Sequence, residues 1–233
     1  MNIKWLGQGG LAVRHNNTLI FIDPYFSDSV GKKSPDKTRM FPVDEKIFDA
    51  KPDVIMLTHN HLDHTDPETL EKLLDNDRRI YVLAPEAAWN EARKYGKNHE
   101  YVLFNRHTEY SIDGILIKAV KAAHSDPHPI GIIITADSKN IYVTGDTLYN
   151  TDIFDDIDVP IDEMYIAING AGNNMNITDA YRFTKKINPK CVIPVHWGLF
   201  ATNDVNPDNF AKMFENDSIK VIIPKVDFDC QNE

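Results

Sequence analysis

The stretch VIMLTHNHLDHTDPETL (residues 54–70) joins a continuous apolar run to a dense group of histidines and aspartates. The apolar run is typical of a strand that is covered on both faces. Directly after it come His59, His61, Asp63 and His64, all of them side chains that can ligate a metal ion. In extended backbone, side chains two positions apart point to the same side, so His59 and His61 can hold one ion. Asp63 and His64 come where the chain turns, and we expect them to face a second ion.

Acidic and imidazole groups also follow strand-like runs elsewhere in the chain. Asp23 ends TLIFID, His124 ends ILIKAVKAAH, Asp146 follows NIYVTG and His196 follows CVIPV. Because strand ends at one edge of a sheet lie close together, these distant residues can converge on the 59–64 segment. His124 could then complete the first metal site and His196 the second, with Asp146 bridging both. Taken singly, each is more often a packed or hydrogen-bonded residue, and its place at a strand end is what favours the ligand interpretation.

Imidazole and carboxylate ligands together suit a borderline divalent cation such as Zn, Mn, Fe or Ni. Two such ions would lie roughly 3.5–4 Å apart and share a water whose pKa falls from about 15.7 to near 7. We expect the resulting hydroxide to attack a lactone or ester carbonyl whose oxygen is polarised by one ion. Asp63 would hold the proton or pass it to the leaving oxygen. This chemistry needs no protein nucleophile, so the absence of a G-x-S-x-G motif is no objection.

Charge, cysteine content and hydropathy narrow the class of protein. The formal net charge of −10 argues against a nucleic-acid partner, whose binding depends on Lys and Arg. The two cysteines, Cys191 and Cys230, are not in a C-x-x-C motif and fit a reducing compartment. No apolar run approaches the roughly 18–20 residues of a membrane span, and the N-terminus lacks a signal-peptide pattern. We therefore expect a cytoplasmic protein with a small-molecule substrate and no membrane partner, and we leave homo-oligomer formation open.

The order of the predicted elements indicates a mixed α/β fold, in which strands come first in each half and strand–helix alternation follows. Helices are expected over 66–74, over 85–96, and from Thr178 and Asn206 onward, with a polar loop over 27–40. The pattern predicts two β-sheets packed together with helices outside, a four-layer αββα sandwich. We expect a single domain over 1–233, with similar halves at roughly 1–107 and 108–233.

The motif T-H-x-H-x-D-H at 58–64, a later histidine, G-D-T at 145–147 and a late histidine after a strand together resemble the metallo-β-lactamase superfamily. The resemblance extends from Asp23 to His196 and implies the αββα sandwich with its metal site at the sheet edge. It implies a first metal held by His59, His61 and His124, a second held by Asp63, His64 and His196, and Asp146 between them. It also implies that Asp23 supports the loop that carries the ligands.

Three longer segments are similar to the L-ascorbate-6-phosphate lactonase-like branch of that superfamily: IDPYFSDS (22–29), THNHLDHTDPETL (58–70) and INGAGNNMNITDA (168–180). That branch implies hydrolysis of a lactone in a phosphorylated sugar acid, usually with two divalent ions, Mn or Zn. This chain is shorter than the enterobacterial lactonases of that branch. Two other functions stay open: a metal-dependent phosphodiesterase acting on a nucleotide or lipid headgroup, and a non-catalytic metal-binding module.

Residues that contact substrate are harder to predict than the metal ligands. Asn169 follows a strand and could reach the substrate, but an Asn-Gly turn explains it equally well. A basic group, Lys32, Lys33 and Arg39, could clamp a substrate phosphate, although such a run is more often a solvated loop. Trp197 and Phe200 are the best candidates to line the pocket. The remaining histidines are expected at surface or turn positions: His15, His99, His107 and His128.

Overall fold

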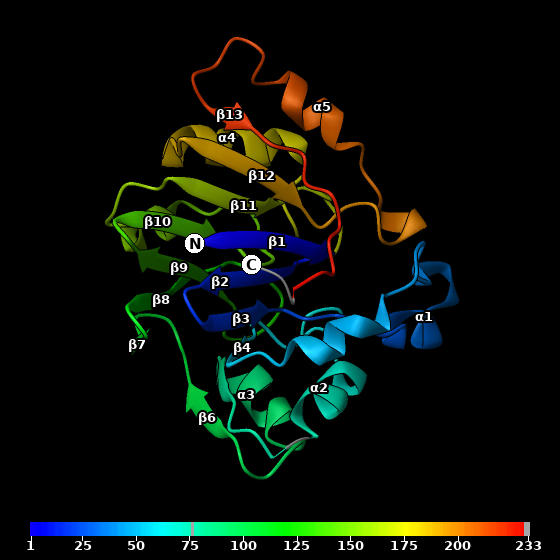
Figure 1. Ribbon diagram of the computed structural model, residues 1–233. Helices are drawn as coiled ribbons and strands as arrows, with labels where there is room; N and C mark the ends of the chain where they lie inside the picture. Colours follow the sequence, from blue (N-terminus) through cyan, green and yellow to red (C-terminus); the bar gives the residue numbers. More distant parts are fainter. Residues whose placement is uncertain (76, 231–233) are drawn as a thin grey trace.

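Two β-sheets form the centre of the fold (Figure 1). The structure is a computed structural model that describes residues 1–75 and 77–230. The six-stranded sheet contains β1 (Asn2–Gly7), β2 (Gly10–His15), β3 (Thr18–Ile22), β4 (Val54–Met56), β5 (Tyr81–Ala84) and β6 (Glu100–Leu103). The seven-stranded sheet contains β7 (Glu109–Ile112), β8 (Ile115–Lys121), β9 (Ile130–Ala136), β10 (Lys139–Val143), β11 (Glu163–Ala167), β12 (Cys191–Val195) and β13 (Lys220–Val221).

Each sheet starts with antiparallel strands and continues with parallel ones. β1, β2 and β3 pair antiparallel, and β3 to β6 pair parallel. β7 to β10 pair antiparallel, and β10 to β13 pair parallel. Antiparallel neighbours need only a tight turn, whereas parallel neighbours need a crossover, which explains why helices follow the later strands of each sheet. The β9–β10 turn uses Asp137 and Ser138, both with positive φ.

Helices cover the outer faces of both sheets (Figure 1). The α-helices are α1 (Ser29–Lys33), α2 (Pro67–Leu74), α3 (Glu86–Ala92), α4 (Ile177–Ile187) and α5 (Pro207–Lys212). Short 3-10 helices are η1 (Pro35–Lys37), η2 (Glu45–Ala50), η3 (Thr151–Asp156) and η4 (Ala201–Asn203). Side-chain caps start the longer helices: Asp66 accepts a hydrogen bond from the Glu68 amide, and Asn176 accepts from Thr178 and Asp179.

Alternation along the strands separates the buried residues into layers. On β3, Ile20 and Ile22 belong to the core between the sheets, whereas Leu19 and Phe21 belong to the core under α2 and α3. A third core, centred on residues such as Phe183 of α4, fills the space between the second sheet and α4–α5. Since successive strand residues point to opposite faces, a continuously apolar strand can serve two cores at once. These layers confirm the predicted four-layer αββα sandwich.

Several local predictions differ from the structure. The composition of segment 27–40 predicts a polar loop, but the segment contains α1 and η1, since the Lys32 and Ser34 amides donate to the Asp28 and Val30 carbonyls. The helix expected over 85–96 is shorter, ending at Ala92, and Gly96 lies with positive φ in the following turn. α4 begins one residue before Thr178.

Two of the four histidines expected at surface or turn positions are buried, His15 and His99. His99 accepts a hydrogen bond from the Ile80 amide, and its Nε2 lies 2.8 Å from the Leu74 carbonyl oxygen, so it links the end of α2 to the start of β5. His15 is buried beside Asp137. Both residues stand beside a turn or bend, but their rings are buried rather than exposed, because they contact polar groups that are distant in sequence. Among the described residues, no helix is long and apolar enough to span a membrane.

Candidate metal centre

The predicted ligands come together at one end of the sandwich, where five strands finish. Asp23 follows β3, the 58–64 segment follows β4, His124 follows β8, Asp146 follows β10 and His196 follows β12. Backbone conformation helps to aim two of these side chains, because Asp23 and His196 both have positive φ, at 45° and 63°. Such left-handed backbone is uncommon outside glycine and is often found at functional sites.

The first group of ligand atoms comes from His59, His61 and His124, and all of them lie within 4.8 Å of one another. His124 Nε2 lies 3.0 Å from His61 Nδ1. The Nε2 of His59 is buried and has no hydrogen-bond partner among the described residues. Burial, followed by the neighbouring imidazoles, lowers the pKa of His59 well below its usual value, and burial also lowers the pKa of His124. Both rings therefore keep the lone pair that a cation requires.

The second group comes from Asp63, His64 and His196, whose ligand atoms also lie within 4.8 Å of one another. Burial lowers the pKa of His64 and His196, but the neighbouring carboxylates raise it by more. Asp146 raises the pKa of His196 to about 9 and the pKa of His64 well above its usual value. In turn, although burial opposes the shift, His64 and His196 hold the pKa of Asp63 below its usual value. Without a metal, protons supply the positive charge that the carboxylates require, and a divalent cation can replace them.

Asp146 lies between the two groups. Its Oδ1 is 3.4 Å from His64 Nε2 and 3.2 Å from His196 Nε2, and its Oδ2 is 3.8 Å from His124 Nε2. Oδ1 is buried and has no hydrogen-bond partner in the described part of the chain. The neutral imidazoles of His59 and His124, a carboxylate between the two groups and buried acceptors without hydrogen bonds form a donor set that fits divalent cations.

Asp23 lies behind the ligands rather than among them. Its carboxylate accepts hydrogen bonds from the Thr58 amide at 2.7 Å and the Thr58 hydroxyl at 2.5 Å, and it lies 2.7 Å from His64 Nδ1. Asp23 could also form a ligand group with His59 and His64, but both of its oxygens accept hydrogen bonds from Thr58, and Oδ2 also lies against His64 Nδ1. A carboxylate placed in this way selects the imidazole tautomer and orients the ring.

Glycines provide close approach at two places in the site. Gly145 has a φ of 58°, and a Cβ there would lie 2.9 Å from the Ile130 carbonyl oxygen, so glycine allows the turn that aims Asp146 inward. Gly9 lies against His64, and a Cβ would lie 2.7 Å from its ring carbon Cε1. The β1–β2 turn therefore forms a wall of the second ligand group.

Gln8 and Asn174 belong to the site, although no motif in the sequence identifies them. Gln8 Nε2 donates to Asp63 Oδ2 at 2.7 Å and lies 3.0 Å from His196 Nε2. Asn174 Nδ2 donates to Asp146 Oδ2 at 2.8 Å. Both side chains are almost fully buried. The only available signal was a polar residue within a glycine-rich turn, in WLGQGG and in INGAGNN.

A cleft of about 390 Å³ opens over the ligands, with α1 and η1 on one wall and residues 169–174 on another. Asn169 lines the cleft, and its Oδ1 is buried without a hydrogen-bond partner among the described residues. Phe200 also lines the cleft, as expected. Trp197 is not one of the lining residues: it packs on Trp5 with ring centroids 4.9 Å apart and donates to the Pro194 carbonyl.

The predicted basic group is divided by the structure. Lys32 is paired with Glu68, and Arg39 donates to the Tyr25 and Ser27 carbonyls while its guanidinium lies over the Tyr25 ring. Neither residue lines the cleft, whereas Lys33 does. Lys32 and Arg39 therefore stabilise the 25–41 segment, and a role for them in binding phosphate is not supported.

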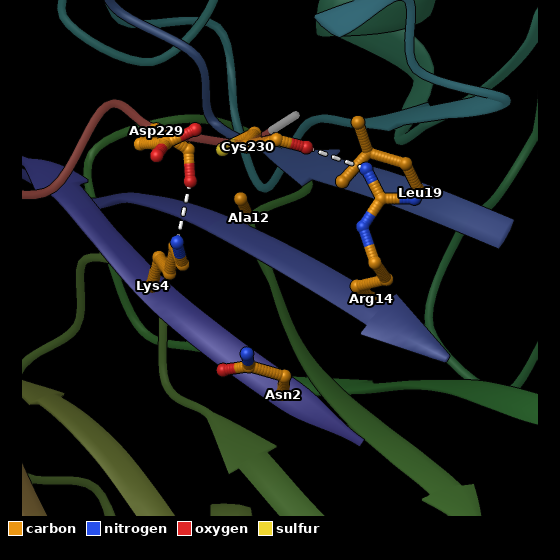
Figure 2. A pocket seen from close by; sticks show the side chains of 7 residues that line it. All are labelled: Asn2, Lys4, Ala12, Arg14, Leu19, Asp229 and Cys230. Carbon is orange, nitrogen blue, oxygen red and sulfur yellow. Dashed lines mark hydrogen bonds between the residues drawn. The ribbon is translucent and has the colours of Figure 1, made fainter. Parts of the chain in front are cut away.

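A second, much smaller pocket lies away from the ligands, between β1, β2 and the C-terminal segment (Figure 2). Lys4 and Arg14 reach from these strands to the main-chain oxygens of Asp229 and Cys230. Its volume of about 20 Å³ is close to that of one water molecule. The hydrogen bonds of Lys4 and Arg14 attach the C-terminal segment to the sheet. The pocket is too small for a substrate.

Comparison with known proteins identifies the family of this chain. Residues 2–196 match the family model described as a beta-lactamase superfamily domain. The chain belongs to the metallo-β-lactamase superfamily. A UPF0173 metal-dependent hydrolase of Bacillus cereus strain G9842 is 28% identical over 239 aligned residues, which cover 95% of this chain and 96% of the relative.

Solved structures share the fold at lower sequence identity. A metallo hydrolase from the archaeon Ignicoccus hospitalis superposes with a TM-score of 0.74 at 22% identity, covering 95% of this chain and 94% of that one. An isothiocyanate hydrolase from Delia radicum gut bacteria gives a TM-score of 0.77 at 18% identity, covering 97% of each chain. At these identities the likeness concerns the fold alone, so the substrate must be argued from the site.

Proposed function

We propose that this protein is a metal-dependent hydrolase that opens a lactone or ester bond in a small substrate, with a phosphorylated sugar-acid lactone such as L-ascorbate 6-phosphate as the first candidate. The observation that carries this proposal is the pair of ligand groups joined by Asp146 at the floor of an open cleft. Relatives that cover nearly the whole chain are named metal-dependent hydrolases, which supports the same reaction class.

The proposed holders of two divalent cations, Mn or Zn, are His59, His61 and His124 for one and Asp63, His64 and His196 for the other, with Asp146 between them. Bound there, the cations would supply Lewis acidity at the substrate carbonyl and acidify water near neutral pH. The chain contributes orientation: Asp23 orients the His64 ring, and Gln8 holds one oxygen of Asp63.

Asp63 is the proposed proton carrier. Its side chain is 19% exposed, and it lines the cleft where a substrate would enter. The adjacent imidazoles keep its pKa below the usual value despite burial, so it is ionised at neutral pH and can accept a proton and return it to the leaving oxygen. The free Oδ1 of Asn169 can accept a hydrogen bond from a substrate hydroxyl. Because the ligands come from both sheets, we propose that the two halves work as a single domain.

The test is hydrolysis of L-ascorbate 6-phosphate by protein freed of metal, before and after Mn or Zn is added back. We expect turnover only with metal, and His61→Ala should abolish it while leaving the fold intact by circular dichroism. Full activity in His61→Ala would refute the role of the first ligand group. Turnover of other lactones but not of L-ascorbate 6-phosphate would refute this compound as the substrate, and the assignment as a lactonase would stand.

A metal-dependent phosphodiesterase is the second candidate, since paired metal sites also serve in-line displacement at phosphorus. It predicts metal-dependent release of nitrophenol from bis(p-nitrophenyl) phosphate and none of the lactone turnover described above. A non-catalytic metal-binding module is the third, and the complete ligand set argues against it. It predicts tight metal binding with no hydrolysis of esters, lactones or phosphodiesters.

A further inference from the structure

One wall of the cleft carries two lysines. Lys33 of α1 and Lys37 of η1 both line it, together with Val30 and Ser34 of the same segment. α1 projects at the end of the sandwich toward which β3 and β12 run, the same end at which the ligands lie (Figure 1). A molecule bound over the metal ligands would therefore lie beside this wall.

These two lysines differ from the other cations of the segment. Lys32 is held by both oxygens of Glu68, at 2.7 and 2.6 Å, and Arg39 is bound to main-chain carbonyls. Among the described residues, the ammonium groups of Lys33 and Lys37 have no ion-pair or hydrogen-bond partner. The cations that point away from the cleft are thus engaged within the protein, and those that line it are available to a ligand.

The charges around the cleft favour an anion at this wall. The chain as a whole has a net charge of −10, so unpaired cations at a cleft stand out against an acidic background. The acidic residues that line the cleft are Asp63 and Asp146, both among the proposed metal ligands on its floor. Lysine is a compact point charge that suits phosphate and carboxylate oxygens, and the Ser34 hydroxyl adds a hydrogen-bond donor.

We propose that Lys33 and Lys37 form a binding site for an anionic group, phosphate or carboxylate, that the substrate carries at a distance from the bond to be hydrolysed. This inference rests on the proposed hydrolase function for the position of the reacting bond. Binding of the anionic group by Lys33 and Lys37 would position the bond to be hydrolysed over the proposed metal ligands.

The test compares the double variant Lys33→Gln/Lys37→Gln with the double variant Lys46→Gln/Lys97→Gln. Both remove two positive charges, and the control pair is exposed and absent from the cleft lining. Calorimetric titration of the metal-loaded proteins with inorganic phosphate and, separately, with acetate measures anion binding without any turnover. We expect the Lys33/Lys37 variant to bind the preferred anion about tenfold more weakly at low salt, with a shallower salt dependence, and the control to match the wild type. The anion that binds more tightly, phosphate or acetate, shows which anionic group the site prefers.

A second arm uses substrates. The KM for a phosphorylated lactone should rise about tenfold in the Lys33/Lys37 variant, while the KM for the same lactone without phosphate stays unchanged. Unaltered anion binding in this variant, or an equal loss in the control, overturns the anion site even where hydrolysis succeeds. If no lactone is hydrolysed but anion binding falls only in the Lys33/Lys37 variant, the anion site stands and the lactonase function fails.

Discussion

Replacing Asp23 by asparagine tests how the ligand loop is held. The carboxylate is 1% exposed and meets three donors: the Thr58 amide, the Thr58 hydroxyl and His64 Nδ1. Asparagine keeps the shape but offers one acceptor oxygen and an NH2 group, so at least one buried donor would face another donor.

The size of the effect follows from these contacts. One buried donor left unsatisfied costs about 1–3 kcal/mol, and hydrogen bonds to a charged acceptor are each worth about 1.5–3 kcal/mol. We therefore expect Asp23→Asn to lower the free energy of unfolding by about 2–4 kcal/mol. The His64 ring would also lose its orientation, which typically weakens metal binding about 10–100-fold. The loss should fall on the group of Asp63, His64 and His196 and spare the group of His59, His61 and His124.

The assay has two readouts. Urea unfolding gives stability, and calorimetric titration of metal-free protein with Zn gives the affinity of each site. Asp49→Asn, an exposed change of the same chemistry, serves as the control and should alter neither value. If Asp23→Asn binds both ions as tightly as the wild type, or loses affinity equally at both sites, the reasoning about His64 is refuted.

Two further predictions concern packing and charge. Gly9→Ala should lower the free energy of unfolding by about 1–3 kcal/mol, and weaken metal binding at the second ligand group, because its Cβ would lie 2.7 Å from His64 Cε1. Asp156→Asn should lower the free energy of unfolding at pH 7 by about 2 kcal/mol, because the buried carboxylate accepts hydrogen bonds from Arg106, His107 and the Lys121 amide. Although burial opposes it, these partners lower the pKa of Asp156 below its usual 3.8. Its stabilising effect is thus present above about pH 4 and is lost as the pH falls further.

Each of these predictions has a matched control. Gly114→Ala strains a turn with a φ of 80°, but a Cβ there meets nothing within 4 Å, so metal affinity should stay unchanged. Equal metal affinity in Gly9→Ala and the wild type would contradict the contact with His64. Asp155→Asn, at the exposed neighbouring position, should leave stability unaltered. A difference between Asp156→Asn and the wild type that stays constant from pH 7 to pH 3 would exclude the proposed linkage.

The sequence by itself determined the fold class and the His and Asp side chains that come together at the strand ends. Apolar runs that end in His or Asp predict buried strands with polar ends, and parallel strands place those ends at one edge of a sheet. The spacing of His59, His61, Asp63 and His64 is local, so it could be interpreted without knowing where the rest of the chain lies. The caps of α2 and α5, Asp66 and Asn206, are local signals of the same kind.

Only the tertiary structure decided which polar side chains face the cleft. Lys32 and Lys33 are adjacent in sequence, yet one pairs with Glu68 and the other lines the cleft, because α1 turns them to different sides. Gln8 and Asn174 reach the ligands from turns whose positions depend on packing between distant elements. Trp197 turns toward Trp5 for the same reason. The direction of a side chain in a turn depends on long-range contacts, whereas the periodicity of a strand or helix depends on its own residues.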